Sequence, residues 1–257
     1  MPRLALLILT LALGLVSPAQ ATDVTLSTRS ASFGDTDPID FGRRGPQAHP
    51  VHGIDVSRFQ GRIDWRAARA AGVNFAFIKA TEGGDLLDTA FKENWRGAAK
   101  AGVLRGAYHF YYFCTKPAKQ ADWYIKNVPR GQGALPPVLD MEWNPHSPTC
   151  TKRPPPAEVR AAMKIFLDRL ERHYGQRPIV YTTPEFYRQN GLSRLKGEEF
   201  WLRSVAQPLD KVYPDQRWSF WQYSGTGIVE GIAGKVDLNA FAGTRQAWSN
   251  WVARRRQ

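Results

Sequence analysis

The order of strand-like and helix-like segments constrains the fold of this chain most strongly. From Val51 onward, short apolar segments alternate with segments that have helical periodicity. The predicted strands are residues 51–56, 74–80, 104–113, 137–143 and 179–182. The predicted helices are residues 65–71, 87–101, 117–128 and 156–174, with a short helix after Thr183. Such alternation is typical of parallel strands that are covered by helices.

The last third of the chain has a different rhythm. Residues 200–205, 218–223 and 236–241 are predicted strands with only loops between them, and Gly and Pro punctuate those loops. Five βα units and three further strands give eight strands, which is enough to close a barrel. We therefore expect an α/β fold, a shortened TIM-like barrel with five βα units followed by three β-strands. An open doubly wound sheet is the alternative, but a late run of helix-free strands would be unusual in it.

The first 50 residues do not fit this pattern. Residues 1–21 combine a basic start, an apolar stretch and the small-residue ending Ala19-Gln20-Ala21, which predicts a cleaved secretory signal peptide. Residues 22–50 are rich in Ser, Thr, Asp, Gly and Pro and cannot bury enough surface to order themselves, so we expect an extended arm. Residues 51–257 remain for one barrel domain.

The predicted signal peptide makes the protein an exported one, either periplasmic or extracellular. The chain has two cysteines, Cys114 and Cys150, and an even pair in an oxidising compartment predicts a disulfide. No metal site and no cofactor are expected, because no CxxC motif occurs and the five histidines are scattered. The net charge of +12 predicts attraction to a polyanion such as a cell wall. We expect no nucleic-acid partner, no stable membrane insertion after signal cleavage, and a monomer.

Two acids end the fourth predicted strand, in the sequence Val138-Leu139-Asp140-Met141-Glu142. Residues two apart on a strand share a face, with backbones roughly 6.6 Å apart. Asp140 and Glu142 would therefore lie side by side at the end of a buried strand. Two such carboxyl groups resist ionising together, which leaves a proton donor beside an anion, the pairing that glycoside hydrolysis uses.

Other polar side chains fall at predicted strand ends, where barrel enzymes build their active sites. Asp55 ends the first strand, Glu82 follows the second and Tyr108 lies in the third, while Gln222 lies in the seventh and Asp237 opens the eighth. Each could instead have a capping or loop role. The aromatic side chains Tyr108, Trp143 and Tyr181 lie near strand ends and could stack on sugars or simply pack in the core.

The strands resemble the lysozymes of glycoside hydrolase family 25. The matching pieces occur in family order: HGIDVS (52–57), FAFIKATEG (75–83), GAYHF (106–110), VLDME (138–142), PIVYT (178–182), FWQYS (220–224) and VDLN (236–239). The resemblance implies a shortened barrel and muramidase activity on peptidoglycan, at the β-1,4 bond between N-acetylmuramic acid and N-acetylglucosamine. It implies Glu142 as general acid and Asp140 as the companion carboxylate, with retention through the substrate's own acetamide.

The resemblance also implies further site residues. Asp55 and Asp237 match two other active-site acids, and Tyr108, Tyr181 and Gln222 match pocket residues. Arg203 stands where family members often have a small residue, so it bears on pocket shape. Two alternatives remain at this point: a chitinase-like acetamido-sugar hydrolase, although the longer acidic strand motif of chitinases is absent, and a non-catalytic wall-binding protein.

Overall fold

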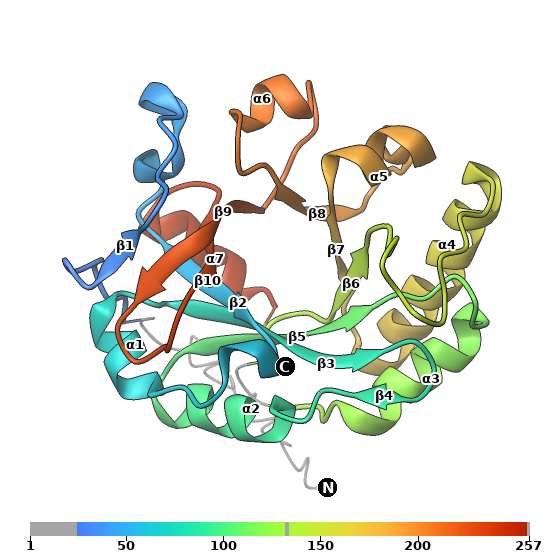
Figure 1. The fold of residues 1–257 in the computed structure, drawn as a ribbon, viewed down its shortest axis with the longest axis horizontal. Coiled ribbons are helices and arrows are strands. Elements are labelled where there is room, and N and C mark those ends of the chain that lie inside the picture. The colour runs from blue at the N-terminus through green and yellow to red at the C-terminus, as the bar shows by residue number, and fades with distance from the viewer. Residues whose placement is uncertain (1–24, 132–133, 256–257) are drawn as a thin grey trace, which may run out of the picture.

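The computed structural model describes residues 25–131 and 134–255, and the predicted signal peptide lies outside them. Eight strands form a closed barrel with helices outside it (Figure 1). In barrel order the strands are β2 (His52–Val56), β3 (Phe75–Glu82), β5 (Leu104–Phe110), β6 (Val138–Met141), β7 (Ile179–Thr182), β8 (Glu199–Arg203), β9 (Phe220–Val229) and β10 (Val236–Phe241). The barrel predicted from the sequence is therefore confirmed.

Strand direction decides which residues share an end of the barrel. Seven of the eight barrel strands, from β2 round to β9 in barrel order, pair in parallel, whereas β10 runs antiparallel to both of its neighbours, β9 and β2. The beginning of β10 therefore lies beside the carboxyl ends of the other strands. This register sets Asp237 directly opposite Asp55.

Helices follow the first five barrel strands, and Figure 1 shows them around the outside. They are α1 (Trp65–Ala71), α2 (Phe91–Lys100), α3 (Pro117–Asn127), α4 (Pro156–Tyr174) and α5 (Pro184–Asn190). The last strands are not free of helix, contrary to the sequence-based expectation. A four-residue helix, α6 (Leu209–Val212), separates β8 from β9, and α7 (Arg245–Ala253) follows β10. One turn of helix is too short to produce a detectable apolar period.

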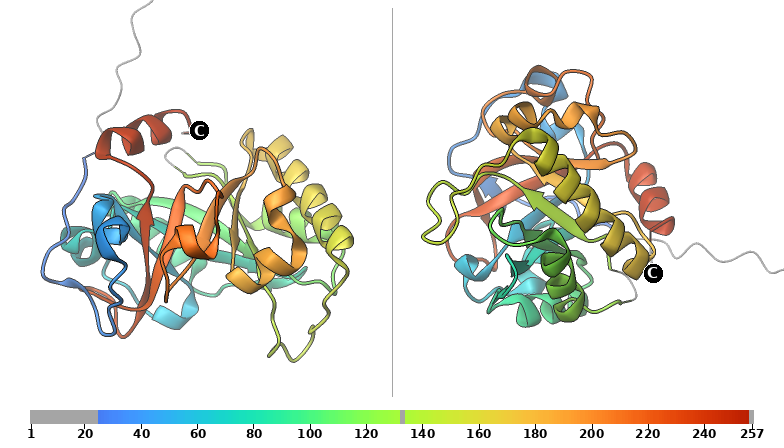
Figure 2. Two further views of the ribbon diagram at one scale, coloured as in Figure 1. Left: turned by 90° about the horizontal axis from the view of Figure 1, so that it is seen from above. Right: turned by 90° about the vertical axis from the view of Figure 1, so that its right-hand side faces the viewer.

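Alternation along the strands divides the apolar core into two layers. In β3, Ala76 and Ile78 belong to the layer between strands and helices, whereas Phe75 and Phe77 belong to the barrel interior. Helix α7 completes that interior, because Trp248 packs against Phe75 at the start of β3 and against Phe241 at the end of antiparallel β10. The helix at the red end of the chain in Figure 2 thus covers the end of the barrel opposite the strand carboxyl ends.

The segment before the barrel is not a detached arm. It includes the short strand β1 (Phe33–Asp35) and two single-turn 3₁₀ helices, η1 (Gly42–Arg44) and η2 (Pro46–Ala48), and β1 pairs antiparallel with β9. Phe33 and Phe41 are buried against the barrel. The expectation from composition, that this segment cannot order itself, did not take account of the barrel, which supplies the apolar contacts that the segment lacks on its own. Among residues 25–131 and 134–255, no helix has the length and apolarity needed to span a bilayer.

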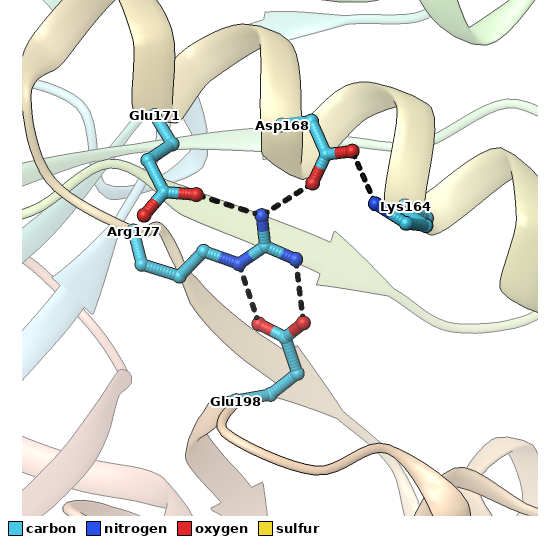
Figure 3. Close-up of polar contacts among 5 residues, drawn as sticks. All are labelled: Lys164, Asp168, Glu171, Arg177 and Glu198. Carbon is cyan, nitrogen blue, oxygen red and sulfur yellow. Dashed lines mark hydrogen bonds and ion pairs between the residues drawn. The ribbon is translucent and has the colours of Figure 1, made fainter.

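Arg177, in the connection from α4 to β7, links three parts of the outer layer (Figure 3). Its guanidinium donates two hydrogen bonds to Glu198, at 2.9 and 2.6 Å, and one each to Asp168 at 2.7 Å and Glu171 at 3.0 Å. The Arg177 side chain is 25% exposed and that of Glu198 only 9%, so solvent screens this contact less than a surface pair.

We expect Arg177→Ala to lower the free energy of unfolding by about 2 kcal/mol. The variant loses the charge-assisted bidentate hydrogen bonds and leaves the Glu198 carboxylate largely buried without this partner. Arg177→Lys should restore less than half, since an ammonium cannot form the paired contact. The matched control is Arg169→Ala, which breaks the more exposed pair with Asp122 and should change stability by less than about 1 kcal/mol. Urea unfolding curves of the three variants measure this, and equal losses for Arg177→Ala and Arg169→Ala would contradict it.

Candidate active site

Four carboxyl groups meet in one pocket at the carboxyl ends of the barrel strands. Asp55 comes from β2, Asp140 from β6, Glu142 from just beyond β6 and Asp237 from β10. The pocket has a volume of about 260 Å³. Its remaining lining is mostly polar and aromatic: Val56, Ser57, Phe59, Gln60, Lys79, Tyr108, Phe110, Tyr181, Trp201 and Gln222. The alternation rule that sets Asp140 and Glu142 on one strand face thus directs both into the same cavity.

Seven of the nine predicted catalytic and substrate-binding residues line this pocket, and two do not. Trp143 follows Glu142 and faces the other way: its ring packs against Phe113 and Phe186, and its indole N–H donates to Gln189 at 2.6 Å. Glu82 lies behind the pocket wall and accepts a hydrogen bond from Lys79 at 2.5 Å. Both residues are close to site residues in sequence, but their side chains contact residues outside the pocket or in its wall and do not line it.

Lys79 is a pocket residue that the sequence analysis missed. It continues the inward-facing series Phe75 and Phe77 of β3, so the period of two that defines the strand could have identified it. Burial opposes ionisation of Glu82, but hydrogen bonds from Lys79 and Tyr112 outweigh it and lower the Glu82 pKa. Glu82 is therefore a steady anion that holds the Lys79 ammonium at the pocket wall.

Burial has the largest effect on the pKa values of Asp140 and Glu142. It raises the pKa of Glu142 to about 7, against the positive charges of Arg203 and Lys79, which pull the pKa down. Burial and then the charge of Glu142 raise the pKa of Asp140 well above its ordinary value. Two neighbouring carboxyl groups in this environment resist ionising together, so one can keep its proton while the other carries the charge. The pair can therefore offer both a proton donor and an anion.

One oxygen of Asp140 has no hydrogen-bond partner among the described residues. Asp140 is 6% exposed, and its Oδ1 is buried without a donor. A buried acceptor without a partner is unfavourable by about 1–3 kcal/mol, more for a charged group. The arrangement suits a ligand that brings its own N–H or positive charge to this oxygen.

A second acid pair, Asp55 and Asp237, lies across from the first. Oδ2 of Asp55 accepts hydrogen bonds from Gln222 at 3.0 Å and from Asn239 at 2.7 Å. Tyr181 donates to Gln222 at 2.8 Å, which fixes that amide in turn. Burial, followed by the charge of Asp237, raises the pKa of Asp55 well above its ordinary value. The Asp55 carboxyl group is thus held in place by two side-chain amides, beside Asp237 in the same pocket.

The predicted disulfide is confirmed. Cys114 and Cys150 are bonded, with their Cα atoms 5.8 Å apart and a sequence separation of 36. Cys114 follows β5 and Cys150 lies in the long connection from β6 to α4, so the bridge ties together two loops at the active-site end. In the chain-entropy description a loop of this size contributes about 3–4 kcal/mol.

Comparisons with known proteins identify the family of the chain. The sequence model of glycosyl hydrolases family 25 matches residues 54–232. The chain is 37% identical over 220 residues to the protein YegX of Escherichia coli O6:H1, covering 82% of this chain and 77% of that one. It is 36% identical over 206 residues to Lysozyme M1 of Streptomyces globisporus, covering 76% of this chain and 68% of that one.

The fold comparison gives the same result. A family 25 glycosyl hydrolase structure from Bacillus anthracis superposes with a TM-score of 0.74 at 34% identity, covering 86% of this chain and 98% of that one. With the family match over most of the barrel, the conclusion is direct: the chain belongs to glycosyl hydrolase family 25 and is a glycoside hydrolase of the lysozyme type.

Proposed function

We propose that this protein is an exported muramidase that hydrolyses the β-1,4 bond between N-acetylmuramic acid and N-acetylglucosamine in peptidoglycan. The observation that carries the proposal is the pair of buried Asp140 and half-buried Glu142 in a pocket of about 260 Å³, with one Asp140 oxygen lacking a partner among the described residues. Membership of the lysozyme family supports a peptidoglycan substrate. The disulfide and the signal-like first 21 residues support export.

In the proposed mechanism Glu142 is the general acid. A pKa of about 7 keeps much of it protonated at neutral pH, so it can give its proton to the departing glycosidic oxygen. The protonated carboxyl group must lose this proton only in the transition state, when the bond to the leaving sugar is breaking. Water then returns the proton through the same carboxylate, now acting as a base.

Asp140 is proposed to be the stabilising carboxylate. As the leaving sugar departs, the substrate's acetamide oxygen attacks the anomeric carbon, and the acetamide nitrogen gains positive charge in a cyclic intermediate. The unpartnered Oδ1 of Asp140 is the acceptor available for that N–H. Water opens the ring on the opposite face, so two displacements at one carbon retain the configuration. Asp55, Asp237, Tyr108, Tyr181 and Gln222 are proposed to position the sugar.

The chemistry of the released end tests the proposed bond. Digestion of purified peptidoglycan, borohydride reduction and mass spectrometry should detect the reduced form of muramic acid. Reduced glucosamine would mean that the other glycosidic bond is cut. Release from chitin with none from peptidoglycan would support the chitinase-like alternative, and sedimentation with the wall without release would support a non-catalytic binder.

Arg203 gives this proposal a pH signature. It ends β8, and its positive charge lowers the pKa of both Glu142 and Asp237 against the effect of burial. Activity requires protonated Glu142 and should fall as the pH rises through about 7. Arg203→Ala removes the opposing charge, so the Glu142 pKa rises and the alkaline limb should move up by about half to one pH unit.

The matched control for this prediction is Arg203→Lys, which keeps the charge and should leave the alkaline limb within about 0.3 pH units of the wild type. The measurement is kcat/KM for soluble peptidoglycan fragments from pH 5 to 9. A limb that moves downward in Arg203→Ala, or moves equally in both variants, would contradict the assigned charge effect.

A further inference from the structure

Phe59 is an exposed aromatic residue at the edge of the catalytic pocket. Its side chain is 76% exposed, which is more than any other large apolar side chain of the described residues. It also contributes to the lining of the pocket that holds Asp140 and Glu142. Single exposed apolar residues are ordinary on protein surfaces. This one differs because of its place at a catalytic opening and because of the way its backbone is held.

The turn that carries Phe59 is fixed by hydrogen bonds from both sides. It is η3 (Arg58–Gln60), directly after β2. The backbone N–H of Phe59 donates to the Ser57 hydroxyl at 3.3 Å, and that of Ser57 donates to the Gln60 side chain at 2.9 Å. The N–H of Arg58 donates to Asp88 at 3.0 Å. The ring is thus presented outward from a pinned backbone, with the Arg58 guanidinium 5.0 Å from its centre.

The pocket is too small for the polymer that the family acts on. Its volume of about 260 Å³ is below the roughly 300–1,000 Å³ of sites that enclose drug-sized ligands. It can enclose the sugar that reacts, and the neighbouring sugars of a glycan strand must cross its rim. Pyranose rings have an apolar C–H face, and aromatic rings offer flat apolar surface for such a face.

We propose that Phe59 is a stacking platform for an N-acetylhexosamine unit beside the reacting sugar, and that it gives the enzyme its affinity for long glycan strands over short ones. This inference rests on the proposed muramidase function. A platform at the rim acts on ground state and transition state alike, so its loss should raise KM and leave kcat unchanged.

The test uses Phe59→Ala and Phe59→Trp in the full mature protein, with Ile165→Ala as matched control. Ile165 is 47% exposed and lies on α4, away from the pocket lining. For long glycan strands, Phe59→Ala should raise KM about fivefold to tenfold with kcat within twofold. This is the effect expected when a bound sugar no longer buries about half of the apolar surface of one aromatic ring. Phe59→Trp should restore the wild-type KM. For the shortest oligosaccharide that is still cleaved, KM should change less than twofold.

A binding arm separates this inference from the proposed function. In a Glu142→Gln background, co-sedimentation with insoluble peptidoglycan should weaken by the same fivefold to tenfold on addition of Phe59→Ala. An active wild type with unchanged KM and unchanged binding in Phe59→Ala would overturn the platform. A loss confined to kcat would overturn it too. An inactive wild type would contradict the muramidase proposal, and the co-sedimentation measurement would still test the role of Phe59.

Discussion

Glu142→Gln is expected to lower kcat on peptidoglycan by about 10²–10⁴-fold, the usual contribution of a positioned general acid. The amide keeps the size of the carboxyl group but has no proton of suitable acidity to donate. KM should stay near the wild-type value, because the sugar contacts remain. The measurement is the initial rate of reducing-end release at pH 6, where Glu142, with a pKa of about 7, is protonated in the wild type.

The same variant should fold at least as stably as the wild type. The folded-state pKa of Glu142 lies above its ordinary value of 4.5, so ionising this carboxyl group destabilises the fold as pH rises through that range. Gln cannot ionise and escapes this effect above pH 7. Glu158→Gln, an exposed acid in the first turn of α4, is the control and should keep full kcat. Retention of more than about a tenth of wild-type kcat by Glu142→Gln would exclude Glu142 as the acid.

Asp140→Asn is expected to lower kcat by about 10²–10³-fold, as for removal of a group that stabilises developing charge in a transition state. Asn fills the same volume but carries no negative charge to balance the positive acetamide nitrogen. Peptidoglycan that is de-N-acetylated at its muramic acid units should resist the wild-type enzyme, because the reacting sugar then lacks the attacking oxygen. Both rates come from the same reducing-end assay. Rapid cleavage of the de-N-acetylated polymer would contradict substrate assistance.

Mass spectrometry of wild-type enzyme quenched during turnover distinguishes the two carboxylate roles. In the proposed route the ring closes within the substrate, so the protein mass should not change. A glycosyl group on Asp140 would make that residue the nucleophile instead of a stabilising charge.

Strong local patterns were enough to predict most of the barrel. Helix α4 was predicted at its observed bounds, because Val159, Met163, Phe166 and Leu170 repeat on one face. The three-residue strand β1 was not predicted, because it is created by pairing with β9 and has little pattern of its own. Helix α7 was missed for a similar reason. Its apolar residues Trp248 and Trp251 pack into the end of the barrel, and this contact depends on the tertiary fold.

The site was predictable where chain direction and alternation determine it. Asp140 and Glu142 share a strand face, and Asp237 reaches them because a final antiparallel strand starts at the carboxyl end of its neighbours. Trp143 was predicted in the site only because it is close to Glu142 in sequence. Side chains alternate along a strand, so Trp143 faces away from the pocket. Phe59 lies on a turn, whose side-chain direction depends on hydrogen bonds to Ser57 and Asp88 that no periodicity encodes.

The anomeric form of the first product tests the central claim most directly, because it reports the bond, the enzyme's activity and the route together. Proton NMR during digestion of soluble peptidoglycan fragments should detect β-muramic acid ends first, followed by slow conversion to the α form. That order means retention, as two displacements at one carbon require. The α form appearing first would mean inversion, and it would contradict the substrate-assisted roles of Glu142 and Asp140 proposed for this pocket.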